Sequence, residues 1–425
     1  MEIELGAPSL GSTVLGMSRI VDAITPPRLG INFRWLLSSS WVTNLGDGLE
    51  VAAGPLLMAS LTRDPRLIAA ALLVQRLPVL LFGLYAGVLA DRLDRRRLVV
   101  VVNVVRAVVL VLLAATIWFD VVTVLTVLVT FFLLGLAETF ADTTTSTLLP
   151  MMVEKPDLGI ANARLMAGHL TANQLVGPPL GAALFAAGMA IPFVTQAVLV
   201  ALGAVLISRI AVTPILRSGE PSKVWIEIRE GVSWLWNHAP VRTLALTVLF
   251  FNVTFGAAWS VLVLLALERL GMGEVGYGLL LTASAIGGLL GTMAYGWLER
   301  HFSLANLMRG GLLIETSTHL VLATTTTPWV AAVTLFFFGI HEVVWGTIAG
   351  TIRQRVVPAE FQGRVASVYM LAVFGGFLIG VALGGAIASR WGVTAPFWYA
   401  FVGSALILVV IWRALDNIAH AEETP

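Results

Sequence analysis

The chain contains no cysteine, only two lysines and few charged residues of either sign. The lack of cysteine excludes disulfides, thiol nucleophiles and iron–sulfur ligation. Neither Lys155 nor Lys223 follows a glycine, so no Walker A loop is available to hold ATP phosphates. Charged residues make up 12% of the 425 residues and hydrophobic residues 58%, whereas about a quarter of a soluble protein is charged. This composition predicts a protein that is solvated mainly by lipid.

The charge balance and the histidines exclude further classes. The 26 basic residues are nearly matched by 25 acidic ones, and this net charge of +1 argues against nucleic acid as a partner. His341 and Glu342 begin like a zinc-protease helix, but Trp345 stands where the second histidine is needed. The other histidines show no ligand spacing. We therefore expect no metal, no cofactor and no enzymatic activity.

The apolar residues fall into twelve stretches, each near the roughly 20 residues that a transmembrane helix needs. We predict an all-α membrane protein with spans at 31–61, 66–90, 98–118, 121–149, 160–187, 191–211, 241–268, 275–298, 303–323, 328–352, 362–388 and 393–413. An even number of spans places both termini on the same side. Residues 1–30 and 414–425, outside the spans, are predicted to be tails. Residues 1–30 do not have the pattern of a signal peptide, because Glu2 and Glu4 stand where a signal peptide has basic residues.

The basic residues predict the orientation of the spans. With the amino terminus inside, the outer loops contain four arginines (Arg63, Arg66, Arg269 and Arg390), and two more, Arg76 and Arg106, lie within spans. The remaining basic residues fall on cytoplasmic segments or helix ends, as the positive-inside rule requires. Both termini are therefore predicted to be cytoplasmic.

Two matching segments indicate that the chain is a duplicated six-helix unit. Residues 132–138 of the fourth span recur as residues 336–342 of the tenth, and residues 177–183 of the fifth recur as residues 380–386 of the eleventh, at nearly the same offset. We predict two halves, residues 31–211 and 241–413, with the substrate site between them. The intervening segment, residues 212–240, is predicted to be a cytoplasmic linker with an amphipathic helix that lies on the membrane.

Ionisable residues in the first two spans are candidate functional groups, because a charge at the centre of a span costs at least about 2.5–3.5 kcal/mol. Asp47 and Glu50 lie three residues apart on one helical face. Asp47 is about 21 Å from the cytoplasmic start of its span, and Arg76 about 22 Å from the cytoplasmic end of the next. Equal depth predicts an Asp47–Arg76 ion pair. The pair is either a permanent structural bridge or a site at which the aspartate exchanges arginine for a proton or a cationic substrate.

A second group of ionisable residues lies nearer the cytoplasmic side. Arg106 and Glu138 have similar depths of about 12–16 Å, and Asp142 follows Glu138 by four residues on the same face. Glu342 is the repeat partner of Glu138, and its one cationic neighbour at that depth is His341. A carboxylate without a cation is suited to carry a proton. At least one of Asp47, Glu138 and Glu342 is expected to couple protons to transport.

The link between the second and third spans is dense in charge. It contains Gly87, Asp91, Arg92, Arg95 and Arg96, in the pattern G-x-x-x-D-R-x-x-R-R. The arginines alone are typical of a basic anchor on the cytoplasmic leaflet. The complete pattern at this position resembles the signature loop of the major facilitator superfamily of secondary transporters. The resemblance implies twelve helices in two pseudo-symmetric six-helix halves.

Within that family, the link has an expected gating role. The resemblance implies that Asp91, with Arg92 and Arg95, latches the cytoplasmic side in one state against the start of the eleventh span, where Arg364 lies. In the fifth span, Gly177, Pro178 and Gly181 are expected to bend the helix. This segment resembles the antiporter motif of drug exporters and implies outward transport.

Several further stretches resemble the twelve-span exporter branch that contains bacterial siderophore and macrolide efflux proteins. They are residues 33–47 of the first span, residues 229–242 of the linker and residues 353–365 before the eleventh span. The resemblance implies a monomer in the bacterial inner membrane that exports an amphipathic or drug-like small molecule in exchange for protons. Siderophore export, import and lipid translocation on the same fold are the alternatives. A channel or a non-transporting scaffold is a more remote one.

Overall fold

The computed structural model describes residues 27–211, 224–358 and 360–415. Both predicted tails, apart from residues 27–30 and 414–415, and residues 212–223 of the predicted linker lie outside the described residues. In the amino-terminal half, the helices are η1 (Pro27–Leu29), α2 (Gly30–Leu61), α3 (Pro65–Arg92), α4 (Arg95–Trp118), α5 (Val124–Leu148), η2 (Leu149–Met151), η3 (Lys155–Asp157), α6 (Leu158–Gly168), η4 (His169–Val176), α7 (Gly177–Ala187) and α8 (Ile191–Ser208).

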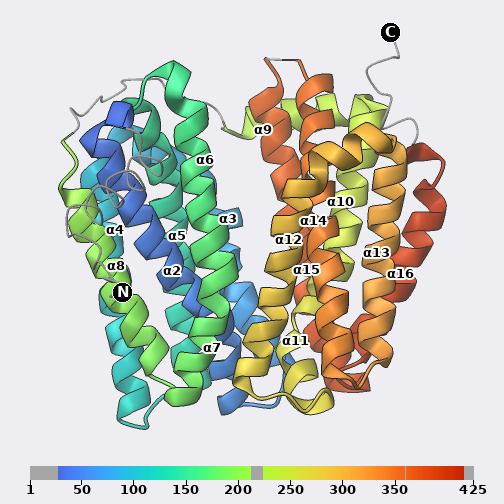
Figure 1. The fold of residues 1–425 in the computed structure, drawn as a ribbon, viewed down its shortest axis with the longest axis horizontal. Helices are drawn as coiled ribbons and strands as arrows, with labels where there is room; N and C mark the ends of the chain where they lie inside the picture. Colours follow the sequence, from blue (N-terminus) through green and yellow to red (C-terminus); the bar gives the residue numbers. More distant parts are fainter. Residues whose placement is uncertain (1–26, 212–223, 359, 416–425) are drawn as a thin grey trace, which may run out of the picture.

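The second part of the chain repeats this pattern. Its helices are α9 (Val224–Asn237), α10 (Ala239–Trp259), α11 (Leu262–Leu264), η5 (Leu265–Arg269), α12 (Glu274–His301), α13 (Leu304–Thr324), α14 (Pro328–Val356), α15 (Gln362–Trp391) and α16 (Ala395–Ile411). Each of the twelve predicted spans coincides with one helix or with consecutive helices. The helices form two bundles, α2 to α8 and α10 to α16, and α9 lies at one end of the molecule (Figure 1). We call this end the α9 face.

The described helices have the lengths and compositions of membrane spans. Eight of them are long and apolar enough to cross a membrane, and α16 is a shorter apolar helix. The first and ninth predicted spans are less apolar, because α2 carries Asp47 and Glu50 and α13 carries Glu315 and His319. The fifth predicted span is divided, because a π-helical segment separates α6 from α7.

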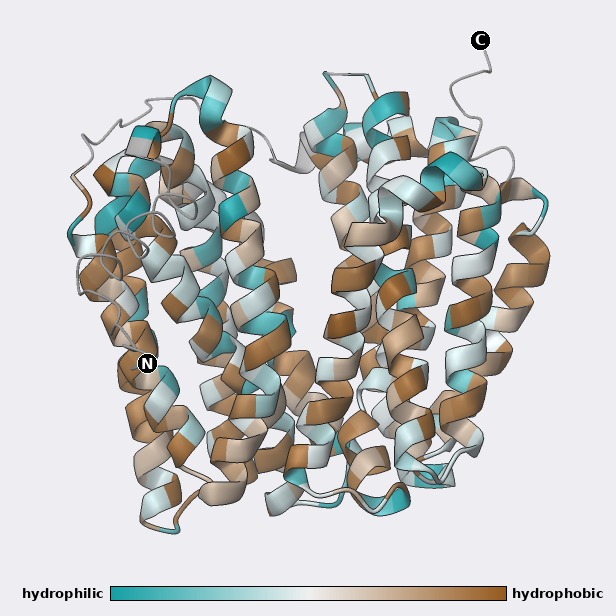
Figure 2. Cartoon of the chain, viewed as in Figure 1, coloured by the Kyte–Doolittle hydropathy of each residue, from teal (hydrophilic) through white to brown (hydrophobic). Residues whose placement is uncertain are grey.

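The hydropathy of the residues follows the expected bilayer. Hydrophobic residues dominate the middle of both bundles, and hydrophilic residues gather at the two ends (Figure 2). Large apolar side chains on the outer helices are exposed, for example Leu112 on α4, Val198 on α8 and Val409 on α16. Because water would not solvate such a surface, these helices face lipid.

Glycines allow the helices of the amino-terminal bundle to pack closely. A Cβ atom at Gly177 would lie 2.5 Å from the Cα atom of Gly48, and one at Gly181 would overlap the carbonyl oxygen of Leu49. Small residues at membrane helix contacts permit such an approach of backbones. Gly177 and Gly181 therefore seat α7 closely on α2.

The two bundles meet at the face opposite α9. Arg63 forms an ion pair with Glu268 across the bundles, with 3.5 Å between Nη1 and Oε1. A Cβ atom at Gly278 of α12 would lie 2.6 Å from the Cβ atom of Ala182 on α7. Toward the α9 face the ribbons of the bundles diverge (Figure 1), and Tyr85, near the end of α3 at that face, is 67% exposed. The bundles are thus joined at one face and separated at the other.

We predict that Gly181→Ala lowers the stability of the protein. The new methyl group would overlap the backbone of α2, and such overpacking costs about 1–3 kcal/mol. Thermal unfolding in detergent measures the effect. Gly296→Ala is the matched control, because Gly296 is also helical but has open space around it. It should leave stability unchanged or raise it by up to about 1 kcal/mol. Equal melting temperatures for the two variants would contradict the prediction.

Candidate functional site

The amino-terminal bundle contains a polar cavity of about 100 Å³ between α2, α4, α5 and η4. Asp47 and Arg106 face each other in it, and Arg106 Nη2 donates a hydrogen bond to Asp47 Oδ1. The Arg106 side chain is 3% exposed and that of Asp47 is 16% exposed. Asn103, one turn before Arg106, accepts a further hydrogen bond from Arg106 Nη1 at 3.4 Å. The buried guanidinium is thereby neutralised by one carboxylate.

The predicted Asp47–Arg76 ion pair is wrong. Asp47 binds Arg106 of α4, while Arg76 lines a separate cavity between the two bundles. The prediction rested on equal depth along α2 and α3, but depth does not fix the direction of a side chain around the helix axis. Successive residues of a helix differ by about 100°. On α3, it is Gln75, one residue earlier, that faces α2.

Glu50 is held by two neutral amides. Its Oε1 accepts a hydrogen bond from Gln75 Nε2 at 2.7 Å, and its Oε2 accepts one from Gln196 Nε2 at 2.6 Å. Glu50 is 6% exposed and also borders the cavity between the bundles. Because amides carry no net charge, they orient this carboxyl group by hydrogen bonds and provide no counter-ion for it. Neither glutamine was among the predicted site residues, since a polar residue in a span gives a weaker signal than a charge.

Glu138 and Asp142 line the same cavity as Asp47 and Arg106. Their spacing of four residues on α5 places them on one face, as predicted. His169 of η4 reaches the cavity as well, with its Nδ1 3.0 Å from Asn44 Oδ1. The amino-terminal bundle thus gathers three carboxyl groups around one guanidinium.

A second cavity of about 100 Å³ lies in the carboxy-terminal bundle. Glu342 borders it together with Asn252 and the aromatic residues Phe255, Phe338 and Trp345. His341, expected to accompany Glu342, contacts Glu315 of α13 instead, with 3.1 Å between Nε2 and Oε2. Glu315 was missed by the sequence analysis, because it has no counterpart in the matched repeat segments.

The cavity between the bundles has a volume of about 130 Å³. Glu50, Gln75 and Arg76 line it from the amino-terminal bundle, and Trp259 and Phe377 from the other. The cavity therefore combines charged and polar side chains with aromatic rings. This is the arrangement expected of a site for an amphipathic molecule.

The charged link between α3 and α4 is fixed to its own bundle. Asp94 caps α4 by accepting a hydrogen bond from the amide of Arg97 at 3.1 Å. Arg95 donates to the Ala90 carbonyl at 3.2 Å, and Arg96 donates to the Ile210 carbonyl at 3.0 Å. The side chain of Asp91 is not among those described. Arg92 ends α3 as its last residue.

Arg364, the predicted partner of the latch, binds α9 in this structure. Its Nη1 lies 2.9 Å from Glu230 Oε2, and its guanidinium lies over the ring of Phe361 at 5.5 Å. Since the two halves diverge at this face, the latch between Asp91 and the start of α15 stays a prediction for another state.

The fifth span changes helix type just before Gly177 and Pro178, where a bend was expected. The helix is π-helical over His169–Val176 and returns to α-helix at Gly177. Pro178 lacks a backbone N–H, so a regular hydrogen-bond ladder cannot pass this point. The interruption places His169 and Asn173 at the polar cavity.

Comparison with known proteins agrees with this fold. The model of the family described as transmembrane secretion effector (MFS_3) matches residues 23–423. The chain is 26% identical to the multidrug efflux pump Tap of Mycolicibacterium fortuitum, over 85% of this chain and 90% of that protein. It is also 26% identical to the uncharacterized MFS-type transporter YfiS of Bacillus subtilis, over 88% and 90% of the two chains.

Solved structures of low sequence identity share the fold. A bacterial homologue of the iron transporter ferroportin in an inward-facing state has a TM-score of 0.70 at 17% identity, covering 92% of this chain and 98% of its own. A bacterial homologue of the lysosomal transporter Spinster has a TM-score of 0.69 at 14% identity, covering 93% and 97%. The protein is thus a multi-pass membrane transporter of the major facilitator type and not an enzyme. It belongs to the MFS_3 family of transmembrane secretion effectors.

We predict that Arg106→Gln strongly destabilises the protein, because Asp47 would be left as a buried charge without a partner. Breaking a buried pair in this way costs about 3–5 kcal/mol. The double variant Asp47→Asn/Arg106→Gln should recover most of the loss, since both charges are then absent. Thermal unfolding of the parent, the two single variants and the double variant measures the coupling energy between Asp47 and Arg106. Arg97→Gln, which removes a 79% exposed arginine, is the control and should have little effect. Additive losses in the double variant would contradict a pairwise interaction.

Proposed function

We propose that the protein exports amphipathic or drug-like molecules from the bacterial cytoplasm in exchange for protons. The observation that carries this proposal is the carboxyl group of Glu50, which is buried, held by neutral amides and placed at the cavity between the bundles. Such a group can bind and release a proton without the loss of an ion pair. The multidrug efflux pump among the relatives supports a drug-like substrate.

The distribution of arginines supports a cytoplasmic location for the α9 face. The link at Arg92–Arg97 and the ends of α14 and α15 at Arg353, Arg355 and Arg364 all lie at this face. Cationic residues are retained on the cytoplasmic side during insertion. With that orientation the divergence of the bundles opens the molecule inward, which is the state that accepts a substrate from the cytoplasm.

In the proposed cycle, substrate and protons compete for the interior carboxyl groups. Substrate enters from the cytoplasm while a carboxyl group is ionised. The halves then rock, and the site faces outward. A proton from outside binds the carboxylate, which weakens its hold on the substrate and favours release. The protonated carrier returns inward and gives its proton to the cytoplasm.

The Asp47–Arg106 pair has a defined place in this cycle. Proton binding to Asp47 would leave the Arg106 guanidinium with Glu138 and Asp142 as the nearest carboxyl groups of the same cavity. A change of partner would move α4 relative to α2 and α5. The pair therefore links the protonation state to helix packing, while Glu50 is the group that titrates next to the substrate.

We predict that the coupling is measurable in inverted membrane vesicles acidified by respiration. Addition of ethidium, a lipophilic cationic dye, should discharge part of the proton gradient, because each dye molecule that enters exchanges for protons. Glu50→Gln should reduce this discharge at least tenfold, and Asp47→Asn, Glu138→Gln and Glu342→Gln should each reduce it. A pH-sensitive fluorescent dye reports the gradient.

Glu274→Gln is the matched control for this assay. Glu274 is an exposed glutamate in the first turn of α12, so its loss should leave the discharge unchanged. If all four interior variants matched the parent, the proton-coupling assignment would be wrong. If ethidium and a panel of neutral and anionic drugs all failed to discharge the gradient in the parent, drug export would be wrong.

The orientation is testable because the chain contains no cysteine. Ser233 on α9 and Thr326 between α13 and α14 are both exposed, at opposite faces of the molecule. In intact cells, a membrane-impermeant maleimide should label Thr326→Cys and not Ser233→Cys. In inverted vesicles the labelling should be reversed. The opposite pattern would place the α9 face outside and would make the structure outward-open.

A further inference from the structure

A buried carboxylate–histidine pair joins α13 to α14 in the carboxy-terminal bundle. The Glu315 and His341 side chains are 9% and 3% exposed and lie 3.1 Å apart through Oε2 and Nε2. Gly311, one turn before Glu315, makes room for the imidazole, since a Cβ atom there would lie 2.5 Å from His341 Nδ1. The close packing of Gly311 against His341 thus allows a specific contact between the two helices. Neither Glu315 nor His341 is among the residues proposed above to couple protons to transport.

The surroundings of the pair contain no compensating cation among the described residues. The cavity beside it is formed by α10, α13 and α14, and its lining consists of apolar and aromatic residues, Asn252, the pair itself and Glu342. The remaining titratable group is His319, one turn beyond Glu315 on α13. His319 is 2% exposed, and neither of its ring nitrogens has a hydrogen-bond partner among the described residues.

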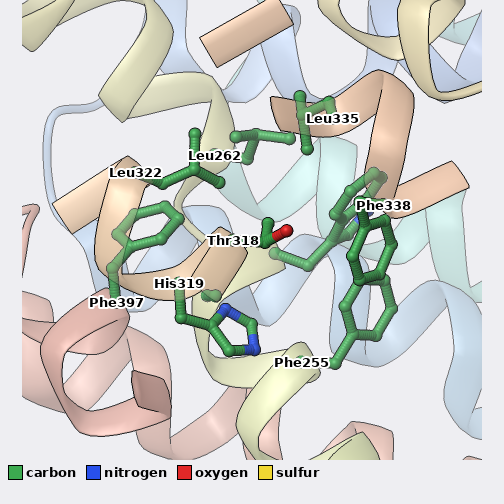
Figure 3. Close-up of a pocket in the computed structure, with 10 residues that line it drawn as sticks. Phe255, Leu262, Thr318, His319, Leu322, Leu335, Phe338 and Phe397 are labelled. Carbon is green, nitrogen blue, oxygen red and sulfur yellow. The ribbon is translucent and has the colours of Figure 1, made fainter. Parts of the chain in front are cut away.

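His319 extends the polar groups toward the opposite face. It lies in a largely apolar pocket with Phe255, Phe338 and Phe397 (Figure 3). Phe255 and Phe338 border both this pocket and the cavity of Glu342. Titratable groups are thereby arranged along α13 and α14 from exposed Glu342, through the buried pair, to His319.

The charge balance of the pair depends on one proton. With a neutral imidazole and an ionised carboxylate, the pair carries one negative charge in an interior that offers no guanidinium or ammonium group. One added proton gives an imidazolium bound to a carboxylate, with no net charge. Burying a net charge costs far more than burying a hydrogen-bonded neutral pair. One proton on the pair therefore removes a net charge from this interior.

We propose that Glu315 and His341 form a proton-binding site of the carboxy-terminal half, which exchanges its proton with the open cavity through the carboxyl group of Glu342. The proton leaves the Glu342 carboxyl group, binds the pair and returns by the same route, and no bond between heavier atoms changes. As a second site for the coupling ion, this assignment rests on the proposed function. It adds a proton site on α13 and α14 to the site on α2.

Trp345 provides a direct reporter of this proton. It lies one turn beyond His341, with 6.3 Å between the ring centroids, and an imidazolium quenches indole fluorescence more strongly than a neutral imidazole. The full-length protein in lipid nanodiscs is titrated with acid, and the signal of Trp345→Phe is subtracted to isolate Trp345. We expect a single-proton step in the parent. The step should be absent in His341→Gln, and in Glu315→Gln proton binding should weaken at least tenfold, which moves the midpoint at least about one pH unit lower.

His301→Gln is the matched control. His301 is stacked on Trp297 at the end of α12, with ring centroids 4.6 Å apart, so its loss should leave the Trp345 step unchanged. A Trp345 signal that is flat between about pH 5 and pH 9, or a step that persists in His341→Gln, would overturn the assignment. Should His341→Gln or Glu315→Gln fail to fold, the parent signal and the smaller shift expected for Glu315→Asp decide the question.

The titration needs neither a transported molecule nor a gradient. If the protein discharges a proton gradient on addition of substrate but shows no Trp345 step, the proposed function stands and this second proton site is wrong. If the protein shows the step but discharges no gradient, the proton site stands and proton-coupled export is wrong. The two proposals therefore fail separately.

Discussion

The contact between Asp47 and Arg106 is the constraint on which the amino-terminal half depends. A single buried charge in a membrane span is costly, whereas a hydrogen-bonded pair is nearly neutral. The pair fixes the rotation of α4 relative to α2, and Asn103, one turn earlier on α4, binds the same guanidinium. The remaining carboxyl groups, Glu138 and Asp142, then lie around a positive charge that already has one partner. The amino-terminal interior thus holds its carboxyl groups around a cation, with no isolated charge exposed to lipid.

The two matching segments, residues 132–138 and 336–342, share a packing role in their own halves. Gly135 on α5 and Gly339 on α14 occupy equivalent positions of the two matching segments. A Cβ atom at Gly135 would overlap the Gln75 carbonyl of α3, and one at Gly339 would overlap the Ser284 carbonyl of α12. Each glycine therefore seats its helix against the second helix of its own half. The glutamates three residues later, Glu138 and Glu342, consequently face corresponding interior cavities.

The sequence was sufficient to predict the helices, because length and hydropathy determine them. It could not predict which charges meet. Asp47 and Arg76 were predicted at equal depth, yet Arg106 is the partner, because depth along a helix axis leaves the direction of a side chain around that axis undetermined. Glu315 was missed for a related reason. Its partner His341 aligns with Ala137 in the repeat, so the pair has no counterpart in the amino-terminal half.

This asymmetry gives the two interior cavities different cations. The amino-terminal cavity sets the guanidinium of Arg106 among the carboxyl groups of Asp47, Glu138 and Asp142. The carboxy-terminal cavity has the imidazole of His341 in place of a guanidinium, beside the carboxyl groups of Glu315 and Glu342. The first half therefore keeps a fixed positive charge among its carboxyl groups, whereas an imidazole is a cation only while it holds a second proton. The halves are joined at the face opposite α9 by the contact of Gly278 with Ala182 and by an apolar core that includes residues of both halves, so a change in their separation at the α9 face would have to repack this shared core.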